Sequence, residues 1–133
     1  GPVPRTYPEK NWSVSTQLQT PAGPAEDTVP EDSSIVVQTA QGLVVVSGCG
    51  HAGIINTLEY AQKTVQATGV HAAIGGFHLF AASDETLAWT ASKLKEARVA
   101  YFLGAHCTGI EAVFRIRQAL GLGAGIDPKA LAQ

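Results

Sequence analysis

Three of the four histidines stand at equivalent places, each shortly after a short apolar run. His51 follows the run at 43–47, and His78 and His106 follow two later runs in the same way. If these runs are parallel strands, their carboxyl ends meet at one edge of a sheet, where functional sites of open α/β sheets gather. Neutral imidazole is a good zinc ligand, and three histidines with an open fourth position form a known catalytic arrangement. The sequence therefore predicts His51, His78 and His106 as metal ligands and catalytic residues, although each could instead be a hydrogen-bonded surface or core histidine.

The remaining histidine and the two cysteines are more ambiguous. His71 begins an apolar run instead of following one, so it has no equivalent place. Cys49 and Cys107 each lie close in sequence to a candidate ligand, and thiolates also bind zinc. The simpler interpretation is that they are small buried residues at tight turns. Two cysteines are in any case too few for a disulfide framework.

Runs of β-branched and apolar residues predict the strands that position these side chains. The runs at 34–39 and 43–47 are separated by a short segment ending in Gly42, which indicates a β-hairpin. Further strands are predicted at 70–74 and 99–103. Those from 43 onward can pair in parallel through right-handed crossovers.

Helical periodicity predicts three connecting segments. The first spans 52–68 with Gly69 as its stop, and the second spans 83–97 with acidic residues in its first turn. The third opens at Thr108, where Glu111 completes a capping box. Its predicted apolar face consists of Ile110, Val113, Phe114 and Leu120. The fold class is therefore α/β, a hairpin followed by β-α-β-α units with helices on one sheet face.

The chain is predicted to divide into three parts. Residues 1–33 hold six of the seven prolines and are expected to form an extended or looping arm without regular structure. Residues 34–121 form the αβ domain, and 122–133 form a Gly/Ala-rich tail along the surface.

Composition restricts the possible partners. Hydrophobic residues make up 45% of the 133 residues and charged residues 15%, as in a globular domain. The net charge of −2 offers no basic surface for nucleic acid or anionic lipid. Apolar stretches are far shorter than the roughly 20 residues of a membrane span, and no secretory leader opens the chain. We therefore expect a cytoplasmic protein that binds neither nucleic acid nor membrane.

Three segments of the sequence carry recognisable motifs: 42–61 with its Gly-Cys-Gly-His core, 74–79, and Gly-Ala-His-Cys-Thr-Gly at 104–109. These motifs resemble those of metallo-β-lactamase-fold hydrolases, and in particular the branch named after a methanogen dihydropterin ribofuranosylaminobenzene phosphate synthase. The motifs occur in family order with family-like spacing. The resemblance implies that His51 matches the third metal-binding motif of the family and His106 the last. His78 stands near the place where many relatives carry a bridging aspartate.

The resemblance also implies that the chain is about half of the family fold, its C-terminal half. The signature His-x-His-x-Asp-His motif is absent, and in relatives it lies upstream, in the other half of an αββα sandwich. The apolar strand runs are typical of strands buried on both faces, whereas three helices can cover only one. A sheet face left uncovered would be a large apolar patch. We therefore expect completion by oligomerisation, as a homodimer or higher homo-oligomer; a separate polypeptide supplying the missing half is the alternative.

Two functions remain open at the level of sequence. The first is a metal-dependent hydrolase, with one or two ions of zinc or another divalent transition metal held by the three histidines. A metal-bound hydroxide would attack an activated small-molecule ester, most readily a phosphoester or a lactone, because no protein general base is obvious. The alternative is a non-catalytic metal-binding or assembly subunit whose partner supplies the rest.

Overall fold

The four longest strands form one mixed sheet in the order β3-β4-β5-β6. The computed structural model describes residues 1–9, 16–27 and 29–122. Strands β3 (Ser34–Thr39) and β4 (Gly42–Ser47) pair antiparallel as the predicted hairpin, while β5 (Val70–Gly75) and β6 (Tyr101–Gly104) add in parallel. The predicted α/β class, a hairpin followed by β-α-β-α units, is therefore confirmed.

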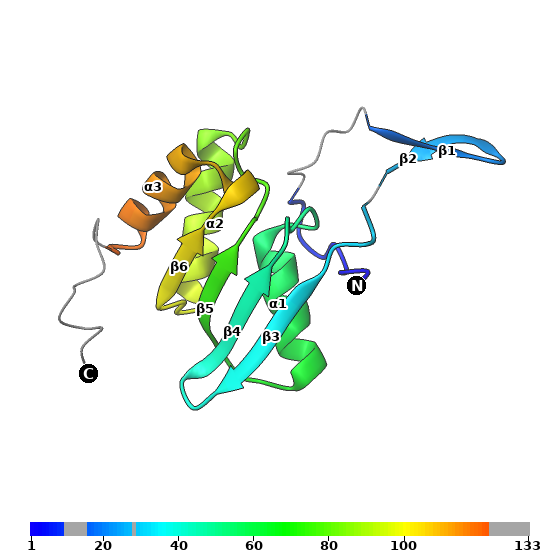
Figure 1. Ribbon diagram of the computed structural model, residues 1–133. Coiled ribbons are helices and arrows are strands. Elements are labelled where there is room, and N and C mark those ends of the chain that lie inside the picture. The colour runs from blue at the N-terminus through cyan, green and yellow to red at the C-terminus, as the bar shows by residue number, and fades with distance from the viewer. Residues whose placement is uncertain (10–15, 28, 123–133) are drawn as a thin grey trace.

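The helices lie on one face of this sheet and bury the core beneath them. Helix α1 (Ile54–Val65) connects β4 to β5, and α2 (Asp84–Glu96) connects β5 to β6. Both lie behind the sheet in Figure 1, and α3 (Ile110–Ala119) packs against α2 and β6. The largest fully buried apolar side chains of this core are Phe77, Phe102, Leu43, Ile54, Leu79, Leu94, Ile116 and Val45. No helix within the described residues is both long enough and apolar enough to cross a membrane.

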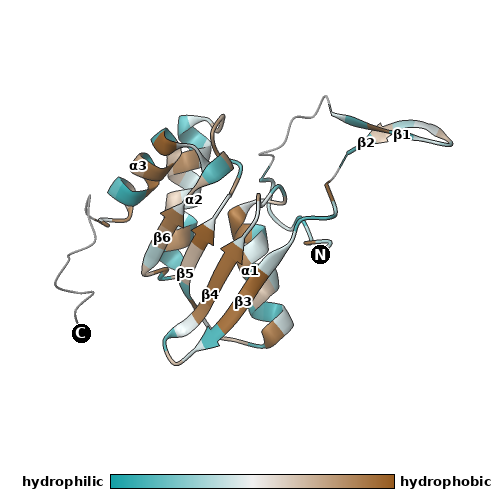
Figure 2. Cartoon of the chain, viewed as in Figure 1, coloured by the Kyte–Doolittle hydropathy of each residue, from teal (hydrophilic) through white to brown (hydrophobic). Residues whose placement is uncertain are grey.

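The other sheet face carries two rows of side chains that run across the four strands. The register aligns Ile35 with Val46, Val46 with Ile74, and Ile74 with Leu103. A second row comprises Val37, Val44, Ala72 and Tyr101. Ile35 is 66% exposed and Leu103 is 40% exposed. Strands β3, β4 and β5 are mostly brown in Figure 2, the colour of hydrophobic residues. We call these two rows the open face; within this chain the strands are not buried on both sides, because all three helices pack on the opposite side.

The N-terminal segment contains regular structure that the sequence analysis did not predict. Strands β1 (Gln17–Thr20) and β2 (Gly23–Glu26) form a separate antiparallel hairpin, which projects from the body of the protein in Figure 1. The Thr20 hydroxyl organises its turn, donating to the Gly23 carbonyl at 2.7 Å and accepting from the Ala22 N–H at 3.2 Å. The prediction of an irregular arm over 1–33 was wrong here, because the proline between the strands occupies a tight turn.

Two predicted helix boundaries also differ from the structure. Helix α1 ends at Val65, before the stop predicted at Gly69, and the left-handed residue that follows it is Gln66 (φ 55°). Helix α3 begins at Ile110 after a short 3₁₀ turn, η1 (His106–Thr108), and has no side-chain cap. Thr108 is fully buried, and its hydroxyl binds backbone groups at the ends of the strands. The predicted capping box is therefore wrong.

The predicted apolar face of α3 is only partly buried. Val113 and Leu120 pack against the core, but Ile110 is 89% exposed and Phe114 is 60% exposed. The buried residues on this helix are instead Ala112 and Ile116. Ile110, Val113 and Phe114 line a groove along α3 together with Arg117 and Gln118.

Candidate metal centre

Three chain segments leave the carboxyl ends of β4, β5 and β6 side by side. The Gly76 N–H donates to the Ser47 carbonyl at 3.3 Å, which ties the end of β5 to the end of β4. The Ala105 N–H donates to the Gly75 carbonyl at 2.8 Å, which ties the end of β6 to β5. These segments carry all three predicted histidine ligands. The three histidines therefore follow strand ends that lie at one edge of the sheet, as the sequence predicted.

His51 and His78 lie against each other at this edge. Their ring centroids are 4.6 Å apart, with an angle of 55° between the planes. On its other side, the His78 ring makes an edge contact with Phe80 at 5.1 Å. Burial, followed by the neighbouring His51, lowers the pKa of His78. The neutral imidazole, which is the form that binds a metal ion, is thereby favoured at this position.

A carboxylate that the sequence analysis missed orients His51. Asp32 Oδ1 lies 2.8 Å from His51 Nδ1, and Asp32 Oδ2 accepts the Ala52 N–H at 3.2 Å. Because an ionised carboxylate only accepts hydrogen bonds, this contact assigns the imidazole proton to Nδ1 and leaves the Nε2 lone pair for a ligand. Arg5 holds the same segment by donating to the His51 carbonyl at 3.0 Å.

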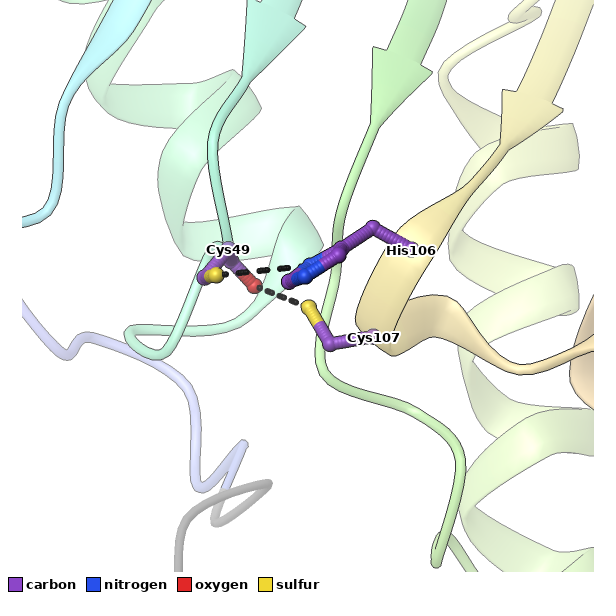
Figure 3. A group of neighbouring side chains, drawn as sticks. All are labelled: Cys49, His106 and Cys107. Carbon is purple, nitrogen blue, oxygen red and sulfur yellow. Dashed lines mark hydrogen bonds between the residues drawn. The ribbon is translucent and has the colours of Figure 1, made fainter.

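His106 lies beside the two cysteines (Figure 3). Its Nδ1 is 3.7 Å from Cys49 Sγ, and the Cys107 thiol donates to the Cys49 carbonyl at 3.4 Å. The ligand atoms of Cys49, His106 and Cys107 all lie within 4.8 Å of one another. Within the part of the chain that the structure describes, these three side chains form the group of His, Cys, Asp or Glu residues whose spacing suits a metal ion. The cysteines are half-buried, so neither is the fully buried turn residue favoured by the simpler interpretation.

The cysteine pair lacks the character of an activated nucleophile. Burial, and then the hydrogen bond with Cys107, raise the pKa of the Cys49 thiol. A catalytic cysteine instead depends on a lowered pKa, which a cationic neighbour or a helix N-terminus usually provides. The arrangement is better suited to binding a cation that displaces the thiol protons.

Unusual backbone conformations occur at two of the three histidines. His78 has φ 46° and His106 has φ 49°, both in the left-handed region that few residues other than glycine adopt. Strain of this kind concentrates at functional sites, where surrounding contacts enforce it. Here Thr108 supplies such contacts, because its hydroxyl donates to the Gly75 carbonyl at 3.0 Å and accepts the Phe77 N–H at 3.1 Å.

The fourth histidine lies apart from this group. The His71 ring contacts the Tyr101 ring, with centroids 5.1 Å apart. Of the predicted ligands, His51 and His78 form one close pair, and His106 is closest to the cysteines. Joint coordination of one ion by His51, His78 and His106 remains a prediction.

Comparison with solved structures places this arrangement in a known fold. The chain superposes with a TM-score of 0.73 and 30% sequence identity on the crystal structure of a metal-dependent hydrolase of the β-lactamase superfamily. The match covers 90% of this chain and 46% of that one. The protein therefore has the fold of about half of a β-lactamase-superfamily hydrolase, as the motifs predicted.

Curated relatives agree with this assignment. Over 86 residues the chain is 37% identical to 7,8-dihydropterin-6-methyl-4-(β-D-ribofuranosyl)-aminobenzene-5′-phosphate synthase of Methanocaldococcus jannaschii. It is 34% identical over 93 residues to an uncharacterised protein of the same organism. The matched parts make up 29% and 33% of those two proteins. No protein-family model matches the chain.

The side chains at this edge fit a divalent metal ion. Imidazole and thiolate are the donors that zinc prefers in proteins. The carboxylate on His51 Nδ1 is the partner that metal-binding histidines usually have. We call the three strand-end segments with these side chains the candidate metal centre.

Proposed function

We propose that the chain is the metal-binding part of a metal-dependent hydrolase, with His51, His78 and His106 as ligands of zinc or another divalent transition metal. One observation carries the proposal: three consecutive parallel strands deliver three imidazoles to one edge, two of them in ring contact at 4.6 Å. The similarity to a metal-dependent hydrolase over most of the chain supports it. When bound, such an ion polarises a carbonyl or phosphoryl oxygen and lowers the pKa of water toward about 7.

The residues around the ligands have positioning roles in this proposal. Asp32 fixes the orientation and tautomer of His51, and Arg5 fixes the backbone that carries it. Asp32 already accepts two hydrogen bonds, so we assign it to positioning and not to proton transfer. Without an assigned proton donor, substrates with good leaving groups are favoured. Activated phosphoesters and lactones meet this requirement.

Metal dependence and histidine substitutions test the proposal together. The purified chain is assayed with an activated aryl phosphoester and an aliphatic lactone, before and after chelation and after zinc is restored. We expect hydrolysis to disappear on chelation, to return with zinc, and to fall at least tenfold in His51→Ala, His78→Ala and His106→Ala. His71→Ala, outside the centre, is the matched control and should keep its rate. Hydrolysis that survives chelation, or that is equal in all four variants, would refute the proposal.

The open face supports a second proposed role, in assembly. Three strands of six residues and one of four, spaced roughly 4.8 Å apart and rising about 3.3 Å per residue, give a face of roughly 350 Å². We propose that a second copy of the chain covers it, because a two-fold axis brings identical apolar rows together. Two such faces bury on the order of 700 Å², below most specific interfaces. The projecting β1–β2 hairpin would therefore have to add contact area.

Native mass spectrometry of the chain tests this assembly. We expect a dimer, and we expect Val46→Glu to shift it to monomer because a carboxylate in the middle of an apolar row would lie unpaired in the interface. Ser34→Glu, at the exposed end of β3, is the matched control. A monomeric wild-type protein at micromolar concentration would exclude a stable dimer.

A further inference from the structure

We propose that Cys49, His106 and Cys107 form a thiolate-containing metal site, distinct from the His51–His78 pair but adjacent to it. The three side chains come from the segments after β4 and β6, and their ligand atoms lie within 4.8 Å of one another. The proposal shares His106 with the proposed function and does not require hydrolysis. With both sites occupied, His106 would connect the two ions.

The geometry brings both sulfurs close to the His106 ring. Cys49 Sγ lies 3.7 Å from His106 Nδ1, and Cys107 follows His106 directly within the 3₁₀ turn (Figure 3). The imidazole in Figure 3 points from its strand toward the two cysteines. A single ion placed between these atoms would therefore need only small side-chain adjustments.

Hydrogen bonds hold Cys107 in place before any ion binds. The Phe80 N–H donates to the Cys107 carbonyl at 3.3 Å, and the Cys107 thiol donates to the Cys49 carbonyl at 3.4 Å, which links the two cysteine segments. Gly76 passes between the segments, and a Cβ at that position would lie 2.9 Å from Cys107 Sγ. The space taken by the sulfur is thus available because residue 76 has no side chain.

The donor set determines which ions fit. Two thiolates and one neutral imidazole balance the charge of a divalent ion, and both thiol protons are released to solvent on binding. Sets with two cysteines, one histidine and an open fourth position occur at catalytic zinc sites. Soft thiolates favour zinc, cadmium and copper(I) over magnesium, calcium or manganese. His106 is exposed, so the open position would face solvent.

Cobalt(II) distinguishes this site from one made of histidines alone, because cobalt bound by thiolate shows intense near-ultraviolet charge-transfer absorption. The full chain is reduced, freed of metal with a chelator and titrated with Co²⁺, with both thiols verified as free. We expect the absorption at one equivalent, and we expect Cys49→Ser and Cys107→Ser each to remove most of it and to weaken Co²⁺ binding about tenfold or more. His71→Ala and His51→Ala should retain the absorption, and circular dichroism verifies that each variant is folded.

The possible outcomes separate this proposal from the hydrolase. Absence of charge-transfer absorption in the wild-type protein at saturating Co²⁺ would overturn it, even if hydrolysis were metal-dependent. Absorption that persists unchanged in either serine variant would overturn it as well. Absorption that depends on both cysteines would support the thiolate site even in a chain without hydrolytic activity.

Discussion

Glu9 gives the stability of the chain an unusual dependence on pH. Its side chain is 4% exposed and lies at the amino end of α1, where its two oxygens accept the N–H groups of Ile55 at 3.1 Å and Asn56 at 2.8 Å. Burial raises the pKa of the Glu9 carboxyl to about 7, even though these hydrogen bonds and Arg5 favour the charged form. Desolvation is the larger effect, so the folded protein binds the proton more tightly than the unfolded chain does.

The sign and size of the effect follow from this difference. A carboxyl group whose pKa is higher in the folded state stabilises the fold below its unfolded pKa of 4.5, and this contribution is lost as pH rises through about 7. At about 1.4 kcal/mol per pKa unit, the loss amounts to about 3 kcal/mol. In Glu9→Gln the side chain stays neutral at every pH. The free energy of unfolding of the wild type, relative to this variant, should therefore fall by about 3 kcal/mol between pH 4 and pH 8.

Urea unfolding of both proteins across this range measures that difference. Any constant cost of placing an amide beside the helix amino end cancels, because only the change with pH is compared. Glu26→Gln, at an exposed carboxylate of β2, is the matched control and should follow the wild type in parallel. A difference between wild type and Glu9→Gln that stays constant from pH 4 to pH 8 would refute the reasoning. It would mean that the hydrogen bonds from α1 fully offset the cost of burial.

Three further substitutions probe the candidate metal centre and its support. Asp32→Ala should lower zinc affinity 10–100-fold in a competitive chelator titration, because the ligand histidine loses the partner that orients it. Thr108→Val should lower the free energy of unfolding by about 1–3 kcal/mol in urea, because the buried Phe77 N–H loses its partner and the Gly75 carbonyl keeps only the Ala105 N–H. Gly75→Ala should give little folded protein by circular dichroism, because its φ is 115° and a Cβ would overlap the Ser47 carbonyl oxygen. Gly69→Ala, where a Cβ would meet nothing within 4 Å, should fold normally. Equal behaviour of the two glycine variants, unchanged zinc affinity or unchanged stability would contradict the corresponding expectation.

Local patterns in the sequence were sufficient for the elements that carry the site. The β-branched runs and the helical periodicity predicted all four strands and three helices after residue 33, with boundaries within a few residues. Parallel pairing then placed His51, His78 and His106 at one edge. This succeeded because strand direction alone decides where the carboxyl ends meet.

Contacts between distant segments were not predictable in this way. Glu9 accepts a hydrogen bond from Ile55, 46 positions later in the sequence, and Asp32 contacts His51, 19 positions later. Nothing in the proline-rich segment around either carboxylate identifies it as a partner of these residues. Helix ends were misjudged for a related reason. Thr108 has the local features of a cap, yet its hydroxyl binds strand-end backbone groups that only the tertiary fold brings near.

The strained histidines and the Thr108 network are two parts of one arrangement. Left-handed backbone at His78 and His106 costs on the order of 1 kcal/mol each, toward the low end for such positions because histidine tolerates this conformation better than most residues. Thr108 joins the segments that carry them, since it binds backbone on both sides of Gly76, two residues before His78, and itself lies two residues after His106. Two hydrogen bonds at a fully buried position contribute enough to offset such strain. The backbone that carries these two histidines is therefore held in its left-handed conformation by the folded chain itself, and an incoming ion need not supply the free energy of that strain.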